Sequence, residues 1–87
     1  MSYKISLAKS AAKDYNDLHE PIKSQINEVI NKLEQFGTDA PNIKPLTGQL
    51  KGYFRIRSGD YRIVFFLGKE AITIVSILHR KEVYKKK

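Results

Sequence analysis

Three short apolar runs and the two glycine-containing turns between them fill most of the second half of the chain and constrain its fold more than any other feature. The runs cover about residues 53–57, 61–67 and 71–79, and they are rich in the β-branched and aromatic residues that favour strands. The segments between them, Ser58-Gly59-Asp60 and Gly68-Lys69-Glu70, have the length and composition of hairpin turns. The sequence therefore predicts an antiparallel meander of three strands.

The first half of the chain predicts one strand followed by two helices. Residues 3–7 alternate apolar and polar side chains, which is typical of a half-buried strand. Residues 8–18 place apolar side chains at steps of three and four, which indicates a helix with one narrow apolar stripe. We expect a second helix to begin at Pro21, because proline is tolerated in the first helical turn. It should end at Phe36, because Gly37 can adopt a left-handed C-cap.

The segment that joins the two halves, residues 38–52, contains two prolines and two glycines, so we expect a surface loop there. The predicted fold class is α+β in the order β-α-α-β-β-β. A helical hairpin should pack on a small, mainly antiparallel sheet of four strands. With 87 residues the chain has room for one such domain, covering residues 1–87.

Composition narrows the chemistry and the location that we expect. The chain has no cysteine and two histidines, which excludes a disulfide framework and argues against a histidine-based metal site. No cofactor is expected. No apolar run approaches the ~20 residues of a transmembrane helix. The lysine-containing N-terminus lacks the apolar stretch of a secretory signal. We therefore expect a cytoplasmic protein that does not associate with membranes.

Positive charge is concentrated in the second half of the chain. The formal net charge is +7. Residues 1–43 hold five lysines and six acidic residues, whereas residues 44–87 hold eleven lysines or arginines and only three acidic residues. All four arginines lie in the second half. This asymmetry indicates that the meander meets a polyanion.

Side-chain alternation divides the predicted meander into two faces. One face looks like core, because it carries Phe54, Ile56, Tyr61, Ile63 and Phe65. The opposite face, which we call the arginine face, carries Tyr53, Arg55, Arg57 and Arg62, and neighbouring strands bring these residues within cross-strand reach. His79 and Arg80 end the last run, and they should point to opposite sides if the strand continues that far.

A cluster of arginines is suited to binding phosphate, because the anion accepts charge-assisted hydrogen bonds and offsets the repulsion among the cations. RNA cleavage without a metal also needs a group that takes a proton from a 2′-hydroxyl and a group that returns one to the leaving oxygen. His79 and Tyr84 are the candidates for both steps. Each residue also has an ordinary structural alternative: a solvated strand arginine, a hydrogen-bonding histidine or a packing tyrosine.

Two stretches, KPLTGQLKGYFRIRSGDYRIVF and ILHRKEVY, resemble the RelE/ParE toxin superfamily, and specifically its RelE-like branch. The resemblance covers nearly the whole chain and implies the same compact fold. It also implies a type II toxin-antitoxin system whose toxin is an mRNA interferase. Such toxins cut messenger RNA in the ribosomal A site, leave a 2′,3′-cyclic phosphate and inhibit translation. They form a hetero-oligomer with a cognate, RelB-like antitoxin that is usually encoded by a neighbouring gene.

The resemblance also implies roles for individual residues. Arg55 matches a basic strand residue of the active surface, Arg62 matches the arginine that contacts the scissile phosphate, and Arg80 matches a transition-state stabiliser. Tyr84 matches the tyrosine that orients or activates the 2′-hydroxyl. We expect further RNA contacts from Arg57, Lys51, Lys81 and Tyr53. Two departures from better-studied members leave the proton acceptor open between His79 and Tyr84: Tyr53 and His79 stand where those members carry lysine.

Two other functions stay open at this point. A ParE-like toxin shares the fold and inhibits DNA gyrase, and it would trigger DNA damage signalling without cut messenger. A non-catalytic basic domain would bind RNA with salt-dependent affinity and release no cleaved product.

Overall fold

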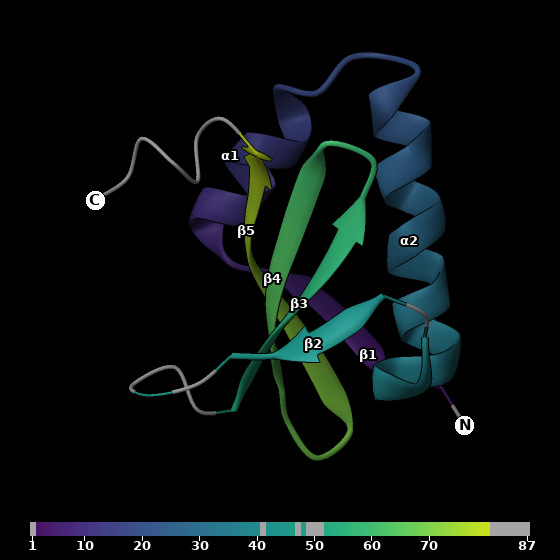
Figure 1. Ribbon diagram of the computed structural model, residues 1–87, viewed down its shortest axis with the longest axis vertical. Helices are drawn as coiled ribbons and strands as arrows, with labels where there is room; N and C mark the ends of the chain where they lie inside the picture. Colours follow the sequence, from purple (N-terminus) through teal and green to yellow (C-terminus); the bar gives the residue numbers. More distant parts are fainter. Residues whose placement is uncertain (1, 41, 47, 49–51, 81–87) are drawn as a thin grey trace.

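The computed structural model describes residues 2–40, 42–46, 48 and 52–80, which form a five-stranded sheet with two helices (Figure 1). The elements in chain order are β1 (Lys4–Leu7), α1 (Lys9–Asn16), α2 (Ile22–Phe36), the short 3-10 helix η1 (Gly37–Asp39), β2 (Ile43–Pro45), β3 (Tyr53–Ser58), β4 (Tyr61–Leu67) and β5 (Ala71–His79). No helix within these residues is long and apolar enough to span a membrane.

The sheet is mainly antiparallel, with the strand order β1-β5-β4-β3-β2. β3, β4 and β5 form the predicted meander, and β1 joins β5 in parallel. The expected α+β class is confirmed, but the expected count of four strands is wrong. β2 lies in the segment that we expected to be a loop, and it pairs with β3 at the sheet edge. Three residues ending in Pro45 carry no strand periodicity, and an edge strand tolerates a proline because its outer side needs no donor.

Both helices pack on one face of the sheet, where the core lies (Figure 1). The helices contribute Ala11, Ile26 and Leu33 to the core, and the sheet contributes Ile56, Ile63, Phe65, Ile72, Ile74 and Ile77. Of the residues that alternation assigns to the core face of β3 and β4, Ile56, Ile63 and Phe65 are buried, and Phe54 and Tyr61 are partly buried against this core. The opposite face of these two strands has no buried residue.

A bulge interrupts β5 where it runs beside α1. Val64 pairs with Ser76 and Phe65 pairs with Ile74, so Val75 is an extra residue with no counterpart in β4. Side chains of α1 form hydrogen bonds with backbone groups of β5 at and beside the bulge. The Ser10 hydroxyl donates to the Val75 carbonyl at 2.9 Å, and the Ile77 N–H donates to the Asp14 carboxylate at 3.2 Å. The bulge reverses the alternation, so that Ile74 and Ile77 both face the helices.

Gly37 ends α2 and lies under the ring of Tyr3. Its φ is +57°, a backbone conformation that residues with a side chain rarely adopt. A Cβ at this position would lie 2.5 Å from Cε1 of Tyr3. The Tyr3 N–H donates to the Glu34 carbonyl at 2.8 Å, so the N-terminal segment crosses the end of the helix at close range.

We expect Gly37→Ala to lower the free energy of unfolding by about 1–3 kcal/mol, from backbone strain and from the contact with Tyr3. Thermal denaturation followed by circular dichroism measures the loss. Gly59→Ala is the matched control, because Gly59 also has a positive φ of 59° but open space around its Cα. Equal losses at the two glycines would show that the approach of Tyr3 contributes nothing.

We also expect Asp14→Ala to lower the free energy of unfolding by about 1–3 kcal/mol, because the Ile77 N–H would lose its acceptor in a partly buried place. Asp14→Asn keeps an acceptor oxygen and should retain most of the stability. Asp17→Ala is the control, because Asp17 is exposed at the end of the same helix. Urea denaturation compares the three variants, and indistinguishable Ala and Asn variants at position 14 would contradict the role assigned to this bond.

Candidate functional site

The face of the sheet opposite the helices carries two arginines directly across from each other. Arg57 of β3 pairs with Arg62 of β4 in the strand register, and the next pair on the same face is Arg55 with Val64. Like charges placed opposite each other on neighbouring strands are destabilising. The fold therefore places Arg57 and Arg62 opposite each other at a cost that a bound anion would offset.

A third arginine reaches this place from the end of β5. The tight turn at Gly59 and Asp60 joins β3 to β4, and the Asp60 carbonyl accepts a hydrogen bond from the Arg80 N–H at 2.7 Å. The Arg80 guanidinium also lies near the Asp60 carboxylate, with Nη1 3.8 Å from Oδ1. Both side chains are about two-thirds exposed, at 64% and 65%, so this ion pair adds little stability. The backbone bond is the contact that fixes Arg80 beside the turn.

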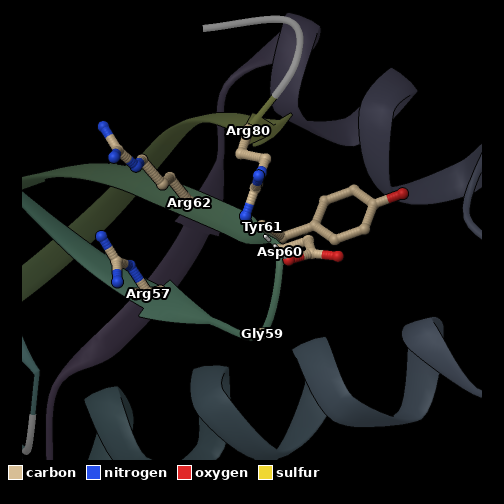
Figure 2. Close-up of a pocket in the computed structure, with 6 residues that line it drawn as sticks. All are labelled: Arg57, Gly59, Asp60, Tyr61, Arg62 and Arg80. Atoms are coloured by element: carbon tan, nitrogen blue, oxygen red, sulfur yellow. Dashed lines mark ion pairs between the residues drawn. The ribbon is translucent and has the colours of Figure 1, made fainter.

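The three arginines surround an open pocket of about 190 Å³. We call it the arginine pocket, and its lining residues are Arg57, Gly59, Asp60, Tyr61, Arg62 and Arg80. Figure 2 shows the side chains of Arg57 and Arg62 extending to the same side, while the Tyr61 ring points away from them. With three guanidinium groups and one carboxylate, the pocket has an excess of positive charge that suits a phosphate group.

The structure places His79 on the other face of the sheet. His79 pairs with Tyr61 in the register, and the two rings meet edge to face with their centroids 5.1 Å apart. The bulge at Val75 is the physical cause, because it reverses the alternation of β5 before the strand ends. His79 therefore faces away from Arg62, and the arginine pocket does not include it.

The remaining predicted residues fall in two groups. Arg55 and Tyr53 lie on the arginine face beyond the pocket, and the Tyr53 ring meets that of Phe66 at 5.1 Å between centroids. Tyr84, Lys51 and Lys81 lie outside the residues that the structure describes. Sequence reasoning treated Asp60 only as a turn residue. Its contacts to Arg80 depend on how closely the end of β5 passes the β3–β4 turn, which no local pattern encodes.

Several known proteins are similar to this chain over most of its length. A family model described as the ParE toxin of type II toxin-antitoxin systems, parDE, matches residues 5–84. Toxin RelE3 of Methanocaldococcus jannaschii is 30% identical over 84 residues, which cover 93% of this chain and 94% of that protein. Toxin RelE of Mycobacterium tuberculosis is 29% identical over 90 residues, which cover 95% of this chain and 87% of that protein.

The fold matches solved structures as well. A chain in the crystal structure of the RelB-RelE antitoxin-toxin complex from Methanococcus jannaschii superposes with a TM-score of 0.77 and 28% sequence identity. The match covers 92% of this chain and 95% of that one. The resemblance that the arginine-containing stretches suggested is thus confirmed over almost the whole length, and the chain belongs to the RelE/ParE superfamily of type II toxin-antitoxin toxins.

Proposed function

We propose that this toxin is an endoribonuclease that inhibits translation by cleaving messenger RNA in the ribosomal A site. The observation that carries the proposal is the arginine pocket, which Arg57, Arg62 and Arg80 line together with a single carboxylate, that of Asp60. Attack of a 2′-hydroxyl on the adjacent phosphodiester forms a 2′,3′-cyclic phosphate and expels the 5′-oxygen, which takes up a proton. Negative charge builds on the phosphate oxygens during this step, and pre-positioned guanidinium groups stabilise it. The cleavage needs no metal ion if the chain itself supplies the cations and a proton acceptor. Similarity to RelE toxins supports this assignment.

The arginines would divide the work according to their positions. Arg62 lies on a central strand of the sheet and would bind the scissile phosphate, while Arg80 would stabilise the charge that develops in the transition state. The ion pair of Arg80 with Asp60 is long and exposed, so an incoming phosphate can replace the carboxylate as partner. The backbone bond to the Asp60 carbonyl keeps Arg80 in place meanwhile. Arg55 and Arg57 would hold the RNA backbone, together with Lys51 and Lys81.

Tyr84 is the proton acceptor that we favour. His79 contacts Tyr61 on the helix side of the sheet, so its ring would have to cross to the other face to reach a phosphate held by Arg62. Positive charge near a tyrosine favours the phenolate, and the arginines would provide that charge. In this proposal His79 supports the end of β5 and takes no proton from the RNA.

The partners that we propose follow from the relatives. The crystal structure of the RelE relative from Methanococcus jannaschii is a complex with its antitoxin RelB. By analogy, this toxin would form a hetero-oligomer with a RelB-like antitoxin from a neighbouring gene. In the free form it would act on the ribosome and its messenger RNA in the cytoplasm.

A second candidate function is inhibition of DNA gyrase. It is favoured by one observation, namely that the family model matching residues 5–84 is described as a ParE toxin. Inhibition by binding needs no transition-state stabilisation, so the arginines would then serve only as contacts. A third reading, a basic domain that binds RNA without cutting it, also needs no proton acceptor.

We expect Arg62→Ala and Arg80→Ala each to lower the rate of messenger cleavage by about 10²- to 10³-fold, because each removes a group that stabilises the developing charge. Mapping the 5′ ends of transcripts after brief induction without antitoxin measures cleavage, and growth arrest is scored in parallel. Lys32→Ala is the control, because it removes one exposed positive charge from α2, on the helix side of the sheet. Unchanged cleavage in both arginine variants would disprove the nuclease proposal, and DNA damage signalling without cut messenger would support gyrase inhibition.

A second pair of variants tests the proton acceptor. Tyr84→Phe should lower the cleavage rate by about 10²- to 10⁴-fold, the usual contribution of a general base. His79→Phe keeps an aromatic ring against Tyr61 and should retain most of the activity. The same 5′-end mapping, with melting temperatures to confirm folding, measures both variants. The opposite ranking would assign the proton transfer to His79.

A further inference from the structure

Two aromatic rings lie on the arginine face at the end away from the arginine pocket. Tyr53 of β3 pairs with Phe66 of β4, and their centroids are 5.1 Å apart with an interplanar angle of 61°. We call these two residues the aromatic pair. The Phe66 side chain is 40% exposed, which makes it one of the few large apolar side chains at the surface of the described residues.

The backbone holds the Phe66 ring in place. The position that a Cβ of Gly52 would occupy lies 3.0 Å from Cε1 of Phe66, so the ring rests against a glycine that leaves room for it. Gly52 has a φ of +93°, a conformation that residues with side chains rarely adopt. The ring is therefore supported on one side by Tyr53 and on another by the main chain. Such support restricts the orientation of the Phe66 ring, as a stacking partner requires.

The aromatic pair and the arginines of the pocket form one continuous surface. Along β3, Tyr53 lies four residues from Arg57, and along β4, Phe66 lies four residues from Arg62. At a strand rise of about 3.3 Å per residue, this step places the two pairs roughly 13 Å apart on the same face. Arg55 lies between them on this face, paired with Val64. A ligand lying along the strands would meet guanidinium groups at one end and aromatic rings at the other.

Single-stranded RNA is the ligand whose chemistry fits both ends. Its phosphates are attracted by the arginines, and its bases are flat rings that stack on aromatic side chains largely irrespective of sequence. The strands that carry this face contribute no carboxylate to it, so the charge is complementary to a polyanion along the whole path.

We propose that the aromatic pair is a stacking site for a nucleobase of the RNA whose phosphate lies in the arginine pocket. The inference rests on the proposed function for the identity of the RNA as messenger, but not for the stacking itself. Tyr53 and Phe66 then act as positioning residues. By holding one base at a fixed distance from Arg62, they set which phosphodiester of the strand reaches the pocket.

The test measures binding, separately from cleavage. A short fluorescein-labelled oligouridylate with 2′-O-methyl groups cannot be cleaved, because the 2′-oxygen can no longer attack, and fluorescence anisotropy reports its affinity. We expect Phe66→Ala to weaken binding by about 5- to 150-fold, the range found when a stacking residue is truncated. Phe66→Leu, which keeps apolar volume without a π-face, should weaken it nearly as much. Phe36→Ala is the matched control, because Phe36 is 52% exposed and ends α2.

Two further measurements separate stacking from a structural effect. Abasic RNAs, each lacking one base, should show one position at which loss of the base weakens binding to the unchanged protein. For Phe66→Ala, loss of the base at that position should cause no further decrease in affinity. The slope of log affinity against log salt should stay the same in Phe66→Ala, whereas Arg62→Ala should reduce it by about 0.7 through the loss of a phosphate contact.

Several outcomes would overturn the proposal. These are equal affinities for Phe66→Ala and Phe36→Ala, no position that is sensitive to base removal, or no binding by the unchanged protein. Loss of antitoxin binding in Phe66→Ala with RNA affinity intact would make the aromatic pair a protein contact instead. Base stacking on Phe66 without messenger cleavage would support the inference and contradict the nuclease proposal. Messenger cleavage with no effect of Phe66→Ala on RNA binding would support the nuclease proposal and contradict the inference.

Discussion

The register of β3 against β4 is the constraint on which the rest of the molecule depends. Ile56, Ile63 and Phe65 are buried under the helices, and this burial fixes which side chains of the two strands face outward. A slip by one residue would turn the apolar side chains to solvent and place Arg62 in the core, where an unpaired charge is very costly. The same burial therefore holds Arg57 opposite Arg62 and Tyr53 opposite Phe66. Stability arises on one face of the sheet, and the candidate site lies on the other.

This separation explains how the fold tolerates an unfavourable arrangement of charge. The pairing of Arg57 with Arg62 lowers the stability of the fold, and the exposed ion pair between Arg80 and Asp60 adds little stability. Neither residue pair belongs to the core, which is made of apolar side chains from both helices and the sheet. The fold can therefore keep the arginines available for an anion without depending on them for its own stability.

The elements that repeat a clear pattern could be predicted from the sequence. α2 and the three strands of the meander were expected almost where they occur, because their periodicity is set by the same burial that stabilises them. The arginine face of β3 and β4 followed from the same alternation. β2 could not be predicted, because three residues at a sheet edge gain their structure from pairing with β3 and show no pattern of their own. The face of the sheet on which His79 lies could not be predicted from the sequence either. It depends on the extra residue Val75, which the side chains of Ser10 and Asp14 accommodate from another element.

The bulge in β5 connects α1, on one face of the sheet, with the arginine pocket on the other face, because α1 bonds to the bulge and β5 leads to Arg80. It decides on which side of the sheet each of the last residues of β5 emerges, and Arg80 follows that strand directly. α1 thus supports the bulge that determines which face of the sheet the last residues of β5 occupy, although α1 lies on the opposite side from the arginines. Under the proposed function, substitutions at Ser10 or Asp14 would weaken the toxin without altering any residue of the pocket. If the arginines act as proposed, a selection for harmless variants would recover two separate clusters of substitutions, one at the arginines and one on α1.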